Sequence, residues 1–217
     1  MKIALLHHTP INVIAKATSL PYDSKPTKEL VERVWDSQHR SIARHGMACF
    51  LIEDISQSLL RQISRHPHIN LTVKSSRYCD MKGSQIFIPE TKLNKRSAKR
   101  FTKHINKIMT IYSKWQQYEI KNKVKDVAKL FLPLASTTDL VLSGNYQALY
   151  EMLQLRNCVN AEDEIRHLSL AITGILKLNV PEIFKDLGCR GDEFGVCPEI
   201  NSCGTYPSKI TKRRDDT

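Results

Sequence analysis

The sequence predicts an α+β fold. Three short apolar segments with strand-like composition are interspersed with several amphipathic segments that show helical periodicity. The chain has no internal repeat and no glycine-rich phosphate loop of the dinucleotide-binding or Walker type. With 217 residues, of which 41% are hydrophobic, it is long enough for one large domain, with or without appendages, around a sizeable core.

The N-terminal part is expected to contain two strands and a helix. Residues 2–6 are mostly apolar and predict the first strand. The segment 27–37 predicts a helix, because Thr27 suits the N-cap position and the apolar residues after it form one stripe. Residues 45–55 are apolar and β-prone without a helical period, so they favour a second strand.

A short helix is expected to follow the second strand. Ser56 suits its N-cap, and three apolar residues with helical spacing would form its buried face: Leu59, Leu60 and Ile63. Pro67 is expected to end this helix, because the residue before a proline is disfavoured in the helical conformation. Residues 68–78 are expected to continue as a loop and a short extended segment.

The remaining elements are expected to be mostly helical. A long basic helix or helix pair is predicted over residues 91–130, and an extended segment over 132–144. Two amphipathic helices follow over 145–156 and 161–178, and residues 181–188 are expected to add a last helical turn or two.

The charge of the chain indicates anionic partners. The net charge is +11, and much of the excess lies in residues 93–129 and in the last nine residues. Such an excess is typical of proteins that bind nucleic acid or another polyanion, and a small phosphorylated substrate is the other possibility. A solvated helix face and a frayed tail would also account for these runs without any binding role.

The sequence indicates a cytoplasmic location and leaves two roles open for its cysteines. No apolar run approaches the ~20 residues of a membrane helix, and the N-terminus does not resemble a signal peptide, so we expect a cytoplasmic protein with reduced thiols. The segment 189–217 is loop-like and rich in cysteine. Four thiolates are candidates for a structural zinc site, although free buried thiols are the simpler interpretation: Cys158, Cys189, Cys197 and Cys203.

The segment RHPHINLTVKSSRY, residues 65–78, gathers groups that bind anions. Alternation along an extended segment would place Ser75 and Arg77 on one side, opposite Gln62 and Arg65 at the end of the preceding helix. Two guanidiniums, a hydroxyl and an amide suit a phosphate and a polar ring. A surface salt-bridge network is the alternative. Arg156 ends a later helix, where it would bind a ligand or simply compensate the helix dipole.

These residues resemble the signature of flavin-dependent thymidylate synthases, the thymidylate synthase complementing protein family. The family motif runs Arg-His-Arg, two residues, Ser, one, Asn, two, Ser, one, Arg-Tyr. Further landmarks occur in the family's order, such as the His-x-Ser-x-x-x-His element at residues 39–45. The positions that match the motif itself are Arg65, His66, Ser75, Arg77 and Tyr78.

The resemblance covers about residues 1–188 and leaves a tail over 189–217. It implies a single domain in which helices flank a central mixed or antiparallel sheet. It also implies transfer of a one-carbon unit from methylenetetrahydrofolate to C5 of dUMP, giving dTMP. FAD would supply the hydride, NADPH would reduce the flavin, and the sites would lie at the subunit interfaces of a homotetramer.

The resemblance also implies roles for individual residues. Arg156 would be catalytic, because a guanidinium at the uracil stabilises the charge that develops on the ring. The residues implied for dUMP are Gln62, Arg65, Ser75, Arg77, Lys129 and Arg156, with Lys129 standing where the family has an arginine. The residues implied for FAD are Ser41, Arg65, His66, Pro67, His68, Asn145, Gln147 and Glu151.

Several departures mark a divergent member. Pro67 and Gln147 replace arginines of the family pattern, which removes positive charge on the flavin side, and His68 is a candidate to take over part of that role. Three alternatives therefore stay open: a variant that hydroxymethylates dUMP, a nucleotide-binding relative without flavin chemistry, and a basic nucleic-acid-binding protein. The last is the least favoured, because the aromatic residues of segment 93–129 have core-like helical spacing.

Overall fold

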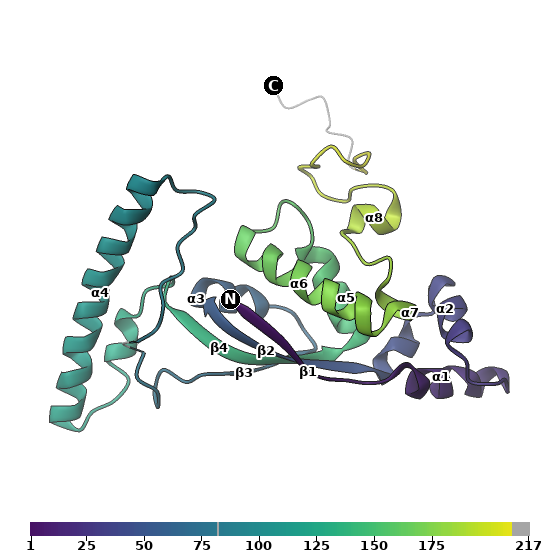
Figure 1. Ribbon diagram of the computed structural model, residues 1–217, viewed down its shortest axis with the longest axis horizontal. Coiled ribbons are helices and arrows are strands. Elements are labelled where there is room, and N and C mark those ends of the chain that lie inside the picture. The colour runs from purple at the N-terminus through teal and green to yellow at the C-terminus, as the bar shows by residue number, and fades with distance from the viewer. Residues whose placement is uncertain (82, 210–217) are drawn as a thin grey trace. The chain divides into compact units, whose positions relative to one another are not determined.

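The structure is a computed structural model that describes residues 1–81 and 83–209 (Figure 1). In chain order, its elements are β1 (Lys2–His8), α1 (Ile11–Ser19), the 3-10 helix η1 (Leu20–Tyr22), α2 (Lys28–Asp36), η2 (Arg40–His45), β2 (Met47–Ser56), α3 (Gln57–Ile63), β3 (Ile69–Val73), α4 (Lys95–Asn122), η3 (Ala128–Phe131), β4 (Thr137–Asn145), α5 (Tyr146–Arg156), α6 (Asp163–Asn179), α7 (Pro181–Phe184) and α8 (Arg190–Phe194). The α+β class is confirmed.

The described chain forms two compact units. The first consists of Met1–Ala4, Phe50–His66 and Asn70–Leu142. The second consists of Leu5–Cys49, Pro67–Ile69 and Ser143–Thr217, so the described part of the tail is counted with it. Among the described residues, no helix has the length and apolar character needed to span a bilayer.

The four strands form one sheet in the order β1-β2-β4-β3. Its neighbouring strands run antiparallel, as the hydrogen bonds at their ends show. Gln57 N, after the end of β2, donates to Ser136 O, just before β4, at 3.0 Å. Lys74 N, after the end of β3, donates to Asp139 O near the start of β4, at 2.9 Å. The antiparallel sheet implied by the resemblance is therefore present.

Two features of the first unit differ from the prediction. Helix α3 begins at the predicted cap, where Ser56 Oγ accepts from Leu59 N at 3.0 Å, but it ends at Ile63, before Pro67 has any effect. The predicted extended segment beyond β3 is a turn, in which Ser75 O accepts from Cys79 N at 2.9 Å. Ser75 and Arg77 are therefore brought together by a turn and not by strand alternation.

The basic segment forms one long helix, α4, followed by the short η3 (Figure 1). Tyr112 is buried on its inner side with Met81 and Ala128, as expected for core spacing. Trp115 and Tyr118, in contrast, remain 37% and 49% exposed, so the expectation that they belong to the core is wrong. Trp115 instead stacks on Phe131 of η3, with ring centroids 5.6 Å apart.

The second unit contains helices that were predicted and helices that were not. Helix α2 begins at Thr27, whose hydroxyl accepts from Leu30 N, as predicted. Helices α1, η2 and α8 were not predicted. Helix α1 is rich in β-branched residues, which lower helix propensity, yet it buries Ile14 and packs against α2. Helix α8 lies in the tail that was expected to be loop, and Arg40 forms an ion pair with its Glu193.

Gly46, in the second unit, lies so close to its neighbours that adding one methyl group there is expected to destabilise the protein. A Cβ on Gly46 would lie 2.3 Å from Tyr146 Cδ2 and 2.7 Å from Ile14 Cδ1. Tyr146 has little freedom to move, because its ring is fully buried and its hydroxyl donates to Thr9 O at 2.6 Å. We expect Gly46→Ala to lower the free energy of unfolding by about 2–3 kcal/mol, measured by urea denaturation.

Gly174→Ala is the control for this prediction. Gly174 lies in α6, where an added Cβ meets nothing within 4 Å. The control is expected to stabilise the protein by about 0.5–1 kcal/mol, because alanine favours a helix more than glycine. Equal effects of the two substitutions would contradict the assigned contact between Gly46 and Tyr146.

Candidate functional site

Two of the residues implied for dUMP meet at one carboxylate in the first unit. Arg77 Nε lies 2.9 Å from Asp126 Oδ1, and Lys129 Nζ lies 2.8 Å from the same oxygen. The hydrogen bond from Lys129, together with the charge of Arg77, lowers the pKa of the Asp126 carboxyl below its usual range. Arg77 and Lys129 are therefore close enough to bind a single anionic group.

The turn that carries Arg77 is held by its backbone and by a hydrophobic cluster. Arg77 N donates to Ser75 Oγ at 3.2 Å, which gives the predicted serine a role in fixing the turn. Met81 N then donates to the Tyr112 hydroxyl at 3.3 Å, and both side chains are buried with Ala128 of η3. The cluster thus anchors the Arg77 turn and the start of η3 to α4.

A cavity of about 490 Å³ adjoins this turn. Basic and acidic side chains line it, together with the rings of Tyr78 and Tyr112. Arg77 Cζ lies 5.7 Å and Lys125 Nζ 5.9 Å from the centroid of the Tyr78 ring, which is largely exposed. Cations beside an aromatic face suit a ligand that carries both a negative charge and a planar ring. The residues that line this cavity include Arg77, Tyr78, Gln116, Glu119, Lys123 and Lys125.

The other residues implied for dUMP occupy different positions. Gln62 lies in the last turn of α3, and Arg65 follows the end of that helix with its side chain exposed. Arg156 is the last residue of α5 and belongs to the second unit. The structure brings together Ser75, Arg77 and Lys129, while the grouping of Gln62, Arg65 and Arg156 with them stays a prediction.

The position of Arg156 is determined by its neighbour Asn157, which is buried. Asn157 Oδ1 accepts from Ser169 Oγ at 2.7 Å, and its Nδ2 donates to Thr173 Oγ1 at 3.1 Å. Its carbonyl accepts from Arg166 Nε at 3.3 Å. This network ties the end of α5 to α6, so Arg156 is presented from a rigid helix end, as positioning of a charge requires.

Several residues implied for FAD line a cavity of about 310 Å³ in the second unit: His68, Asn145, Gln147 and Glu151. Asn145 caps α5, with its Oδ1 accepting from Ala148 N at 2.9 Å. Gln147 Nε2 donates to Glu151 Oε1 at 2.9 Å. These two contacts fix the side chains of Asn145 and Gln147 at the start of α5.

Arg44 is a residue of this cavity that the sequence analysis missed. Its Nε donates to Gln147 Oε1 at 2.7 Å, so a guanidinium lies beside the glutamine that replaces a family arginine. Arg44 also lines a second cavity of about 430 Å³, with His39, Ser41 and His45. Its position inside the His-x-Ser-x-x-x-His element was the available signal, but only folding shows that it adjoins Gln147.

The backbone at Pro67 and His68 has a special conformation. Pro67 lies in a turn, and His68 follows with a φ of +65°, in the left-handed region that non-glycine residues seldom adopt. Such conformations occur often at binding sites, where the surrounding structure maintains them. His68 lines the same cavity as Arg44, so both side chains can be reached by a ligand in that cavity.

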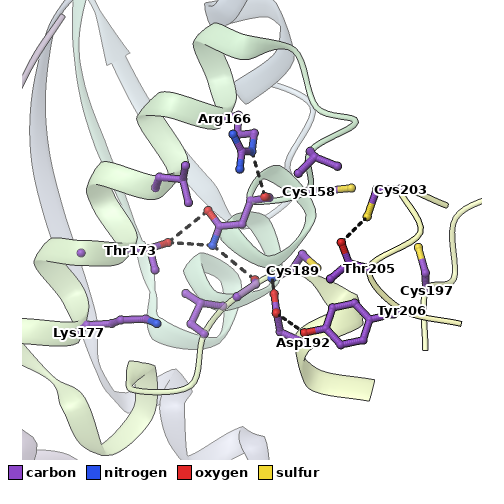
Figure 2. A pocket seen from close by; sticks show the side chains of 16 residues that line it. Cys158, Arg166, Thr173, Lys177, Cys189, Asp192, Cys197, Cys203, Thr205 and Tyr206 are labelled. Carbon is purple, nitrogen blue, oxygen red and sulfur yellow. Dashed lines mark hydrogen bonds between the residues drawn. The ribbon is translucent and has the colours of Figure 1, made fainter. Parts of the chain in front are cut away.

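The four tail-associated cysteines line one cavity of about 450 Å³, but they do not form the zinc site that the sequence suggested (Figure 2). Within residues 1–81 and 83–209, no group of three or more histidine, cysteine, aspartate or glutamate side chains is arranged to hold a metal. Burial raises the pKa of the Cys189 thiol, which disfavours the thiolate that zinc binds. None of the four is in a disulfide, and only Cys197 is buried, so the expectation of buried thiols is wrong for Cys158, Cys189 and Cys203.

Comparison with known proteins identifies the family. The model of the thymidylate synthase complementing protein family matches residues 4–182. A flavin-dependent thymidylate synthase from Geobacter sulfurreducens is 29% identical over 221 residues, which cover 94% of each chain. One from Nitratidesulfovibrio vulgaris is 27% identical over 185 residues, covering 82% of this chain and 76% of the relative.

A solved structure agrees with the sequence comparison. The crystal structure of thymidylate synthase X from Helicobacter pylori with FAD and dUMP matches with a TM-score of 0.66 and 26% identity. The match covers 86% of this chain and 99% of the Helicobacter chain. The chain therefore belongs to the flavin-dependent thymidylate synthase family.

Proposed function

We propose that this protein transfers a one-carbon unit from methylenetetrahydrofolate to C5 of dUMP, giving dTMP, with FAD as the redox cofactor and NADPH as the reductant. The observation that carries the proposal is the convergence of Arg77 and Lys129 on one carboxylate oxygen, at two positions that the resemblance to the family implies for dUMP. The Helicobacter relative was solved with FAD and dUMP, which supports the same ligands here.

The residues of the chain have distinct roles in the proposed reaction. Arg77, Lys129 and Ser75 bind the nucleotide phosphate, while Gln62 and Arg65 contact the nucleotide from the end of α3. Arg156 stabilises negative charge on the uracil ring, which makes C5 a better nucleophile. When bound and reduced by NADPH, FAD would supply the hydride, and the polar groups at the start of α5 together with Arg44 would hold it.

A direct assay tests the proposal. Purified protein supplied with FAD, NADPH, methylenetetrahydrofolate and dUMP is expected to form dTMP, identified by mass. A product heavier than dTMP by one oxygen would indicate the hydroxymethylating variant instead. A protein that binds dUMP but shows no flavin absorption after incubation with FAD and gel filtration would indicate the relative without flavin chemistry.

The flavin site predicts an effect of restoring a family residue. Pro67→Arg is expected to tighten FAD binding about tenfold, because a charge-assisted hydrogen bond to a phosphate contributes about 1.5–3 kcal/mol. Isothermal titration with FAD measures the change. Pro67→Ala is the control, since it removes the proline without adding a guanidinium. Equal affinity of the arginine and alanine variants would show that the missing charge at position 67 does not limit FAD binding.

We also propose that the protein is a homotetramer and acts in the cytoplasm. The resemblance that led to the family implies sites built from several subunits, and reduced thiols suit a cytoplasmic location. Light scattering of the purified protein tests the assembly, which is expected to have four times the 24.9 kDa mass of the chain.

A further inference from the structure

Asp126 contacts both cations that the proposed function assigns to the substrate phosphate. One oxygen of its carboxylate lies 2.9 Å from Arg77 Nε and 2.8 Å from Lys129 Nζ. We propose that Asp126 competes with the nucleotide phosphate for these two cations, and thereby lowers the affinity for dUMP and dTMP. This inference rests on the proposed function and adds a specificity-determining residue to it.

The loop around Asp126 holds its carboxylate in place. Asp126 has a φ of +72°, a conformation that few residues other than glycine adopt without support from their surroundings. That support comes from Glu119 of α4, whose Oε1 accepts from Val127 N at 2.5 Å and from Ala128 N at 2.9 Å. The preceding turn is also left-handed, with Lys123 capping α4 at a φ of +56°.

The charge of Asp126 opposes a second anion at the same cations. Both ion-pair partners are partly exposed, at 49% for Arg77 and 33% for Lys129, so a ligand can reach them from solvent. A phosphate monoester carries close to two negative charges at neutral pH. The phosphate must displace the Asp126 carboxylate or bind beside it. Either way, the phosphate binds Arg77 and Lys129 more weakly than it would if the charge of Asp126 were absent.

A purely structural role for Asp126 predicts the opposite result. If the carboxylate only orients Arg77 and Lys129, its removal loosens both side chains and weakens nucleotide binding. Asp126→Asn separates the two roles, because the amide oxygen still accepts hydrogen bonds from Arg77 and Lys129 while the negative charge is gone.

Isothermal titration of Asp126→Asn with dUMP, dTMP and deoxyuridine tests the proposal. The variant is expected to bind dUMP and dTMP about tenfold more tightly than the unmodified protein, since a nearby unit charge acts on a doubly charged phosphate. Affinity for deoxyuridine, which has no phosphate, is expected to stay the same. The gain for dUMP is expected to shrink as salt is raised.

Asp139→Asn is the matched control. Asp139 lies in the same unit and pairs with Lys74 at 3.5 Å. Its substitution by asparagine removes the same unit of negative charge from the chain as Asp126→Asn does. It is expected to leave the affinity for dUMP within about twofold, because the charge is removed away from Arg77 and Lys129.

Three outcomes overturn the inference, and one of them also overturns the proposed function. Unchanged or weaker dUMP binding by Asp126→Asn shows that Asp126 does not compete, while the proposed function stands. An equal gain from Asp139→Asn shows that net charge alone is responsible. Failure of the unmodified protein and of Asp126→Asn to bind dUMP removes the nucleotide site itself, and the proposed function with it.

Discussion

Arg156→Ala is expected to lower the rate of dTMP formation by about 10²–10³-fold while the protein stays folded. The guanidinium is proposed to act on charge that develops on the uracil ring during the reaction. Its loss therefore raises the barrier of the chemical step more than it weakens binding of dUMP. Single-turnover experiments with the reduced flavoenzyme measure that step directly.

The fold is expected to survive this substitution because the neighbouring residue holds the junction. Asn157, Ser169 and Thr173 keep their hydrogen bonds between α5 and α6 when the Arg156 side chain is removed. Arg33→Ala is the control, since Arg33 is also an arginine in the last turn of a helix, α2, and its side chain is exposed. If Arg156→Ala turned over as fast as the control, Arg156 would have no catalytic role.

Arg77→Ala is expected to weaken dUMP binding by about 10–100-fold, because it removes a charge-assisted hydrogen bond to the phosphate. In a thermal shift assay, dUMP is expected to raise the melting temperature of the unmodified protein, and most of that shift is expected to be lost in the variant. Deoxyuridine is expected to give almost no shift with either protein. The dUMP shift is expected to fall as salt is raised, since the contacts are ionic.

The melting temperature without ligand is expected to change by only a few degrees. Arg77 is half exposed and its pair with Asp126 lies at the surface, where an ion pair contributes about 0–1 kcal/mol. Lys74→Ala is the control, because Lys74 lies on the same segment and pairs with Asp139. Equal stabilisation of the protein by deoxyuridine and dUMP would contradict the phosphate role of segment 65–78.

The sequence by itself determined the class, the caps and the family. Thr27 and Ser56 are N-caps in the structure, as predicted, because their short polar side chains accept from backbone N–H groups three residues ahead, a local interaction that sequence reveals. The motif residues of segment 65–78, together with further landmarks in the family's order such as residues 39–45, identified the family that the comparisons then showed.

Only the tertiary structure decided which of these residues meet. Asp126 is separated from Arg77 by the whole of α4, and Arg44 is far from Gln147 in the chain, so no local pattern pairs them. The C-terminal end of α3 and the turn at residues 75–79 also escaped prediction, because short elements depend on their packing more than on propensity. The zinc site proposed for Cys158 and the three tail cysteines is a further example. The fold gathers these cysteines around one cavity, but a metal site needs distances and directions that spacing along the sequence does not determine.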